Sequence, residues 1–303
     1  MPMTDAFDPP PGEAVHLRPG LRRIVASNPS AMTYRGTNTY LLGDRDIAVI
    51  DPGPDDPHHL KAILAAIAPD QRITHIIVSH THLDHTPLAR PLQAHCDAQI
   101  YGFGGASAGR SEIMQHLSAS GLVGGGEGVD KGFSPDVTLA DGTLIEAQGW
   151  RLETLHTPGH IGNHICLAWG DDCFTADHVM GWASSLVSPP DGDLSDFMAS
   201  CRRLAQRKWR SFFPGHGDVI ADPAARLDWL IKHRNAREAA ILAALRANPA
   251  PALTLAKVIY TEIPDHLLPA ATRNVLAHLI DLMQREKVAP LGELHSEAEF
   301  KLL

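Results

Sequence analysis

The segment SHTHLDHTP, residues 79–87, places three histidines and an aspartate within six residues, directly after the apolar run ITHIIV. Imidazoles and carboxylates are the usual protein ligands of zinc and related divalent ions. His80 and His82 occupy alternate positions, so in an extended loop both side chains point the same way and can bind one ion. Asp84 and His85 follow at once, and a turn after His82 would direct them toward a second ion. The spacing therefore predicts a metal site rather than a solvated histidine-rich loop.

Three further candidate ligands lie where later strand candidates end. They are His160 in HTPGH, Asp177 in FTADH and His216 in FPGHG. Taken alone, each is better interpreted as an ordinary loop residue. Strand ends gather at one edge of an α/β sheet, however, so all three can converge on the histidine cluster. The combined pattern predicts a site of five histidines and two aspartates.

Short strands and one intervening helix must position these ligands. Apolar or alternating runs bounded by turn residues predict strands at 38–43, 46–53, 73–79, 150–160, 164–170, 172–178 and 210–217. Asp56 can cap a helix with an apolar stripe from Leu60 to Ile67, and residues 194–204 repeat apolar side chains at helical spacing. A strand, a helix and a strand that ends in a functional loop are typical of α/β sandwiches.

The remaining segments suggest a flap and a second unit. Residues 102–132 are rich in glycine, with a short helical pattern around 113–117, and we interpret them as a surface excursion that could form a mobile flap. After residue 222 the pattern changes to helices alone. We therefore expect a main domain at 1–221 and a smaller helical domain at 222–303.

Composition indicates a folded protein with no general affinity for polyanions. The chain has 303 residues, 44% of them hydrophobic and 20% charged, and its net charge of −9 disfavours nonspecific attraction to nucleic acid or anionic membranes. Its four cysteines form no C-x-x-C pair, which argues against a disulfide framework or a thiolate zinc site. The amino-terminal segment lacks the pattern of a signal peptide and no apolar run is long enough to span a membrane, so we expect a cytoplasmic protein.

The order H-x-H-x-D-H, T-P-G-H, a strand ending in aspartate and P-G-H-G resembles the metallo-β-lactamase superfamily over residues 37–219. The strand start at Asn38, HTPGH, PGHG and the helical tail resemble the β-lactamase-like protein 2 and glyoxalase II groups within it. The resemblance implies an α/β fold, a four-layer αββα sandwich followed by a small winged-helix-like domain at the carboxyl end. One departure is the continuation DHTPLARP, where the family commonly has Gly-Gly, so the floor of the pocket is expected to differ.

The resemblance also implies roles for the ligands of a dinuclear centre. His80, His82 and His160 would bind the first ion, Asp84, His85 and His216 the second, and Asp177 would bridge both. The ions would be zinc, with iron and manganese as alternatives. A hydroxide between them would attack a small carbonyl substrate such as a thioester, ester or lactone. Asp84 would orient this nucleophile and accept its proton, which makes it the expected catalytic residue.

Three residues are candidates for contact with substrate. Trp182 lies in the long segment after the bridging aspartate, and loops beyond strand ends commonly carry specificity. Tyr40 is proposed from the resemblance alone, and His164 as a pocket residue or as support for the ligands. We exclude His178 as a ligand because it points away in an extended segment, and we expect Asp51 to hold a turn.

Other functions remain open at this point. One alternative is a metal-dependent endoribonuclease acting on single-stranded RNA, and a second is β-lactamase activity. An iron-based oxidoreductase is disfavoured by His82, since the flavodiiron pattern has glutamate there, and a noncatalytic module is disfavoured by the intact ligand set. Residues 223–303 contain ten basic and nine acidic residues, 10 − 9 = +1, which lacks the basic face that nucleic acid requires. We therefore favour a small-molecule substrate and leave a homodimer open.

Overall fold

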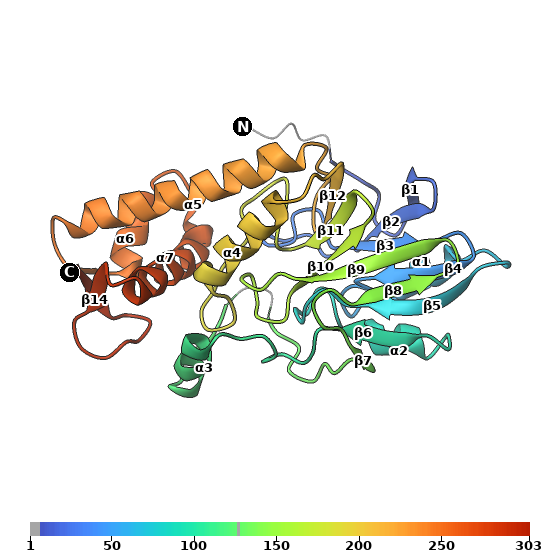
Figure 1. Ribbon diagram of the computed structural model, residues 1–303, viewed down its shortest axis with the longest axis horizontal. Coiled ribbons are helices and arrows are strands. Elements are labelled where there is room, and N and C mark those ends of the chain that lie inside the picture. The colour runs from blue at the N-terminus through green and yellow to red at the C-terminus, as the bar shows by residue number, and fades with distance from the viewer. Residues whose placement is uncertain (1–6, 126–127) are drawn as a thin grey trace.

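Two β-sheets form the amino-terminal part of the molecule, on the right of Figure 1. The structure is a computed structural model that describes residues 7–125 and 128–303. The first sheet has the order β1-β2-β3-β4-β5-β6-β7 and the second the order β12-β11-β10-β9-β8. The first comprises β1 (Val15–Arg18), β2 (Leu21–Val25), β3 (Asn38–Leu42), β4 (Asp46–Ile50), β5 (Arg72–Ile77), β6 (Gln99–Gly102) and β7 (Val137–Thr138). The second comprises β8 (Leu144–Ala147), β9 (Trp150–His156), β10 (Ile165–Trp169), β11 (Asp172–Ala176) and β12 (Ser211–Pro214).

Strand direction changes within each sheet. Strands β1 to β4 pair antiparallel, whereas β4 to β7 pair parallel, with α1 (Pro57–Ala65) and α2 (Ala89–Gln93) as crossovers. In the second sheet only β11 and β12 pair parallel, connected by α4 (Leu194–Ala205). The predicted metal ligands lie in four loops, and three of these loops begin at the carboxyl ends of β5, β11 and β12.

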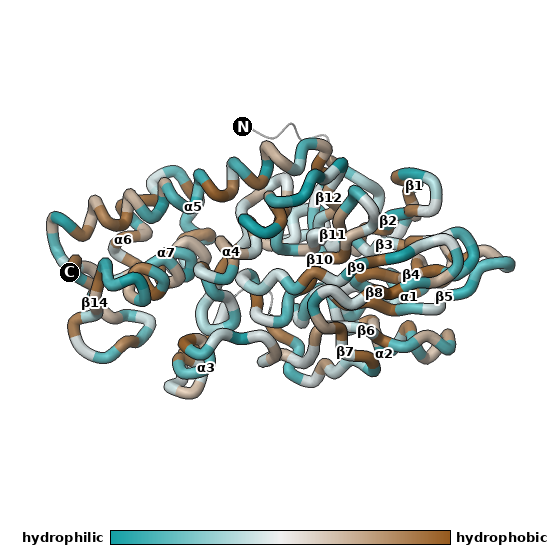
Figure 2. The backbone as a smooth tube through the Cα atoms, viewed as in Figure 1, coloured by the Kyte–Doolittle hydropathy of each residue, from teal (hydrophilic) through white to brown (hydrophobic). Residues whose placement is uncertain are grey.

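Three layers of buried apolar side chains separate four layers of secondary structure. Leu42 and Ile50 of the first sheet pack with Ile165 and Phe174 of the second, in a core between the sheets. A second core lies between the first sheet and the helices α1 and α2, and a third between the second sheet and α4. Figure 2 shows the hydrophobic colour gathered along the strands of both sheets. The predicted αββα sandwich is confirmed.

Aspartate caps begin two of the helices on the outer faces, α1 and α4. Asp56 accepts a hydrogen bond from the backbone N–H of His58 at 2.9 Å, so the predicted cap of α1 is present. Asp193 accepts from the N–H of Ser195 at 2.9 Å at the start of α4, whose apolar side chains face the core as predicted. These caps fix where each helix begins after its loop.

The carboxyl-terminal unit contains strands as well as helices. Its elements are α5 (Pro223–Leu245), β13 (Ala250–Pro251), α6 (Ala252–Ile259), a 3₁₀ turn (Asp265–Leu267), α7 (Leu268–Gln284), β14 (Val288–Pro290) and β15 (Glu299–Leu302). The three strands form a sheet of order β13-β15-β14, so the expectation of helices alone was wrong. Each strand is very short and two contain proline, which hides the strand pattern in the sequence. The small sheet beside helices agrees with the winged-helix resemblance.

Helix α5 belongs to two cores at once. Leu227 and Leu230 pack against the second sheet and α4, whereas Ile241 and Leu245 pack in the core of the carboxyl-terminal unit. This long helix runs along the top of Figure 1 from the sandwich to the small sheet. The boundary between 1–221 and 222–303 therefore stays a prediction, because one element is shared by both sides.

The glycine-rich segment contains the short helix that its sequence pattern predicts. Helix α3 (Glu112–Ala119) buries Met114 and Leu117 in the core of the carboxyl-terminal unit. The segment is thus anchored at its centre. Residues 126–127 of the expected flap lie outside the described part of the chain. Among the described residues, no helix combines the length and apolarity needed to cross a membrane.

Gly159, in the TPGH turn, is expected to be indispensable for stability. Its φ is +139°, and a Cβ there would overlap the backbone of Phe197. We expect Gly159→Ala to reduce the free energy of unfolding by about 1–3 kcal/mol from overpacking, in addition to the cost of the positive φ. Gly149→Ala is the matched control, since Gly149 has φ +93° and open space where a Cβ would lie. Equal losses for both variants in urea unfolding would show that the contact with Phe197 is unimportant.

Candidate metal centre

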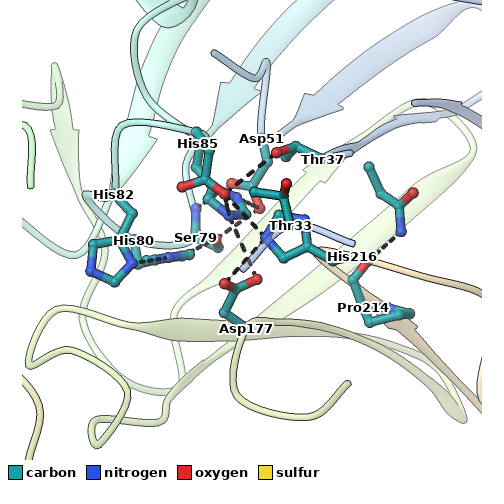
Figure 3. A network of polar contacts seen from close by, with 12 residues as sticks. Thr33, Thr37, Asp51, Ser79, His80, His82, His85, Asp177, Pro214 and His216 are labelled. Carbon is teal, nitrogen blue, oxygen red and sulfur yellow. Dashed lines mark hydrogen bonds and ion pairs between the residues drawn. The ribbon is translucent and has the colours of Figure 1, made fainter. Parts of the chain in front are cut away.

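The predicted ligands converge where the loops of both sheets meet (Figure 3). The loop after β5 supplies His80, His82, Asp84 and His85. Three single residues follow later strands: His160 after β9, Asp177 after β11 and His216 after β12. All seven side chains are buried. The structure therefore brings together residues that are separated by up to 136 positions in the sequence, 216 − 80 = 136.

His80, His82 and His160 form the first ligand group. The Nε2 atom of His80 lies 3.0 Å from Nδ1 of His82, and Nε2 of His160 lies 2.9 Å from the same Nδ1. Three imidazole nitrogens from two loops thus face one point. This is the usual protein environment of a zinc-like ion, with at least one coordination position left for a nonprotein ligand.

Asp84, His85, Asp177 and His216 form the second group. Oδ2 of Asp84 lies 3.1 Å from Nε2 of His216 and 3.3 Å from Nε2 of His85. Oδ2 of Asp177 lies 3.3 Å from Nε2 of His216 and also 3.6 Å from Nε2 of His160, a member of the first group. Asp177 therefore stands between the two groups, in the position that the resemblance assigns to a bridging ligand.

Polar groups behind the rings of His80 and His85 orient them, a hydroxyl for His80 and a carboxylate at ion-pair distance for His85. Nδ1 of His80 lies 2.9 Å from Oγ of Ser79, and Nδ1 of His85 lies 3.0 Å from Oδ2 of Asp51. Asp51 in turn accepts hydrogen bonds from the N–H and the hydroxyl of Ser79, both at 2.7 Å. Each ring therefore turns its second nitrogen toward the centre, as metal-binding histidines do. Asp51 holds the turn, as expected. Through its contacts with Ser79 and His85 it also helps to orient two of the predicted ligands, His80 and His85.

The two histidines from later loops are oriented by backbone carbonyls. Nδ1 of His160 lies 2.7 Å from the carbonyl oxygen of Leu186, and Nδ1 of His216 lies 3.1 Å from that of Gly36. A neutral ring that donates from Nδ1 presents an Nε2 lone pair to the centre. The arrangement matches the needs of a cation rather than those of a hydrogen-bonded cluster.

Unpartnered atoms support the same conclusion. Oδ1 of Asp84, Oδ1 of Asp177 and Nε2 of His85 are buried and have no hydrogen-bond partner, although Nε2 of His85 lies within ion-pair distance of both carboxylates. Buried polar atoms without hydrogen bonds are costly, and a coordinated cation would remove that cost. Within each group the ligand atoms lie within 4.8 Å of one another. The residues present thus fit a pair of divalent ions, and the identity of the ions is not fixed by this donor set.

Without bound ions, the two ligand groups differ in the pKa values of their histidines. Burial, followed by repulsion from His160, lowers the pKa of His82 to about 3, and burial likewise lowers the pKa of His80. Burial opposes charge on His216 too, but Asp177 and Asp84 outweigh it and raise its pKa to about 10. The first group therefore offers neutral nitrogens, whereas the second holds protons that a metal ion would displace.

A cavity of ≈ 210 Å³ opens onto the centre. Its lining includes His82, Asp84, His160, Asp177 and His216. The rest is largely apolar and comes from the segments around Met32 and Met180–Leu186 and from the carboxyl-terminal unit. No lysine or arginine lines it within the described residues. Five of the predicted ligands are thus accessible to a small molecule.

The three predicted substrate contacts have different positions. Trp182 lines the cavity, and its ring stacks on Tyr34 with centroids 5.0 Å apart. Tyr40 does not line it, because its side chain lies in the core between the sheets and its hydroxyl donates to the carbonyl of Pro214 at 2.7 Å. The placement of Tyr40 in the pocket was therefore wrong.

His164 also lies outside the cavity lining. It is buried behind the first group, with its ring centroid 5.1 Å from that of His80 and its Nδ1 2.9 Å from Oγ1 of Thr157. Its proposed contact with substrate is corrected to a supporting position, which was the other interpretation of its spacing. His178 is buried against Phe197 and is not among the grouped ligands, in agreement with its exclusion.

Sequence reasoning missed the contribution of the carboxyl-terminal unit to the cavity. Tyr260, Ile263, Leu267, Ala270 and Asn274 all line it. Their apolar spacing was interpreted only as a helical core, and no signal in the sequence distinguishes a side chain facing a pocket from one facing a neighbouring helix.

Comparison with known proteins establishes the family. Residues 32–216 match the metallo-beta-lactamase superfamily, and residues 252–296 match the beta-lactamase associated winged helix domain. The chain belongs to the metallo-β-lactamase superfamily. This membership confirms the resemblance found in the sequence and the prediction of a metal-dependent hydrolase of this superfamily, with a winged-helix domain at its carboxyl end.

Individual relatives cover most of the chain. The β-lactamase-like protein 2 homolog of Drosophila melanogaster is 31% identical over 277 residues, which cover 88% of this chain and 88% of the relative. A protein of Claviceps purpurea (strain 20.1) named atrochrysone carboxyl ACP thioesterase is 25% identical over 269 residues, 86% of this chain and 76% of that protein. A β-lactamase domain protein from Burkholderia ambifaria has the same fold, with a TM-score of 0.80 at 19% identity over 99% of this chain and 96% of the other.

Asp51 is expected to control metal affinity in this superfamily member although it is not a ligand. Asp51→Asn removes the charge beside His85 and one acceptor of Ser79, and loss of such an outer partner typically weakens metal binding about 10–100-fold. Competition with a chromogenic chelator measures this affinity. Asp55→Asn, an exposed change in the same loop, is the control. Equal affinities for the two variants would contradict the orienting role of Asp51.

Proposed function

We propose that this protein is a dinuclear metal-dependent hydrolase that acts on a small carbonyl substrate, with a thioester favoured over an ester or lactone. The observation that carries the proposal is the largely apolar cavity that is lined by five of the seven buried metal-ligand candidates. His80, His82 and His160 would hold one ion and Asp84, His85 and His216 the other, with Asp177 shared. Zinc is the first candidate for both, and iron and manganese are the alternatives.

A bound pair of ions supplies a water nucleophile that is activated near neutral pH and a Lewis acid for the carbonyl oxygen. The protein's own contribution begins with Asp84. Its Oδ2 faces His85 and His216, whereas its buried Oδ1 has no partner, and Asp84 lines the cavity. Oδ1 can therefore accept a hydrogen bond from the attacking water, orient it and take up its proton.

Other residues position the substrate and exclude water. Trp182, held against Tyr34, forms part of the cavity wall beside the centre, and we assign it contact with the substrate. The apolar lining displaces solvent from the reacting carbonyl, which strengthens the electrostatic effect of the charged groups. A neutral acyl compound matches this combination of polar centre and apolar wall.

The name of one relative favours thioesters within the carbonyl class. The protein of Claviceps purpurea is named an acyl carrier protein thioesterase, and its similarity extends over 86% of this chain. A thioester is uncharged, and its leaving group is a thiolate whose conjugate acid has a pKa of about 8.5, so it needs no cationic group to stabilise the leaving sulfur. The cavity offers none among its described lining residues.

The endoribonuclease alternative is less well supported. A phosphodiester backbone is bound through lysine and arginine, and neither residue lines the cavity in the described part of the chain. β-Lactamase activity is the second alternative and involves the same attack on a carbonyl. We propose a cytoplasmic enzyme that acts on a small molecule, and nucleic acid is not favoured as its partner.

Hydrolysis of a model thioester before and after chelation tests the proposal. We expect the metal-loaded protein to release thiol from an S-acyl N-acetylcysteamine, chelation to abolish turnover and added zinc to restore it. Asp84→Asn should lower kcat about 10²–10⁴-fold, because it removes the group that accepts the proton. The exposed Asp70→Asn is the control.

A chelator-insensitive rate would contradict the metal-dependent mechanism. If the loaded protein cleaves single-stranded RNA or a β-lactam and none of the thioesters, esters or lactones, the substrate class is wrong although the metal centre stands.

A further inference from the structure

The carboxyl-terminal unit forms a large part of the cavity wall. Six of its residues line the cavity together with the metal-ligand candidates: Tyr260, Ile263, Leu267, Ala270, Ala271 and Asn274. They come from the loop that follows α6, the 3₁₀ turn and the first turns of α7. Ile263, Leu267 and Ala270 are each partly exposed, although Ile263 also packs against the core of the carboxyl-terminal unit. Apolar side chains here are thus available to a bound molecule.

The same unit also holds the loop that forms another wall, residues 180–188. Arg226 on α5 donates from Nε to the carbonyl of Met180 and from Nη2 to that of Ala183, both at 2.6 Å. The buried Arg234 on α5 donates to the carbonyl of Ser185. Asn274 on α7 accepts the N–H of Val187 at 3.1 Å. The loop's position therefore depends on side chains of the carboxyl-terminal helices.

Two charged side chains near the cavity, Asp191 and Arg273, bind other groups of the protein. Asp191, which lines it, forms an ion pair with Arg110 at 2.6 Å. Arg273 on α7 donates to the carbonyls of Val123 and Pro189. The remaining surface suits a hydrocarbon group, because removing apolar surface of the bound molecule from water lowers the free energy of binding.

We propose that the carboxyl-terminal unit forms an acyl-binding wall, which makes the enzyme selective for thioesters with an extended apolar acyl group over acetyl thioesters. This inference rests on the proposed thioesterase function. Water's oxygen forms the new bond to the acyl carbon as the C–S bond breaks, and the two protons of water are shared between the released thiol and the carboxylic acid. The acyl group lies along Ile263, Leu267 and Ala270 while its carbonyl faces the metal centre.

A chain-length series tests the selectivity in the full-length, metal-loaded protein. We expect kcat/KM for S-acyl N-acetylcysteamines to rise about fourfold for each added methylene from acetyl until the cavity of ≈ 210 Å³ is filled. Calorimetry with S-octyl N-acetylcysteamine, a thioether that cannot be hydrolysed, gives a second readout. It should bind at least tenfold more tightly than the S-ethyl compound.

Ala270→Phe places a ring in the proposed acyl site. It should lower the octanoyl-to-acetyl ratio of kcat/KM at least tenfold and weaken binding of the octyl thioether by a similar factor. Ala243→Phe, the same substitution at an exposed position of α5, should leave both values as in the unmodified protein. Metal content and the unfolding transition, measured for each variant, identify one that fails to fold. In that case Leu267→Ala, which enlarges the site, takes its place and should shift the optimum to longer chains.

The outcomes separate the two proposals. Thioester turnover with a flat chain-length profile would overturn the acyl wall and leave the proposed function intact. An unaltered octanoyl-to-acetyl ratio in a folded Ala270→Phe would do the same. No turnover of any thioester by the fully loaded protein would overturn the proposed function, and loss of octyl thioether binding would then remove the acyl wall as well.

Discussion

The structure depends on one electrostatic constraint, the burial of two carboxylates among five imidazoles where the two sheets meet. Asp177 is central to it, because its carboxylate contacts His216 of one ligand group and His160 of the other. Such a cluster is unfavourable in a low-dielectric interior unless cations occupy it. The ligand loops can therefore be close-packed only if their charges are satisfied by ions or by protons.

Close packing around this cluster explains residues that do not bind anything themselves. A Cβ on Gly215, in the PGHG segment, would overlap Oδ1 of Asp177, and one on Gly159 would overlap the backbone of Phe197. Glycine is required at these positions so that loops can approach one another closely. The motifs that indicate the site in the sequence therefore contain both the candidate ligands and the glycines that the close approach of the loops requires.

The convergence of the seven candidate ligands could be predicted from the sequence because chemistry and spacing coincide. His80, His82 and Asp84 are local, and the later ligands each end a recognisable strand. Tyr40 was misplaced because the family resemblance, on which its assignment rested, does not show which layer its side chain enters, and that layer is the core between the sheets. The cavity residues from Tyr260 to Asn274 were missed for a related reason, since their contact with the centre arises only when the carboxyl-terminal unit packs on the sandwich. Strands as short as β13 carry too few residues to show a period.

The count of metal ions bound to the purified protein tests the central claim most directly. Elemental analysis after reconstitution and removal of free metal should give two ions for each chain, and Asp177→Ala should lose at least one of them because both groups contact that carboxylate. Asp171→Ala, a surface change before β11, should retain both ions. A protein that retains no metal, or an Asp177→Ala variant that still binds two ions with unchanged affinity, would contradict the dinuclear centre.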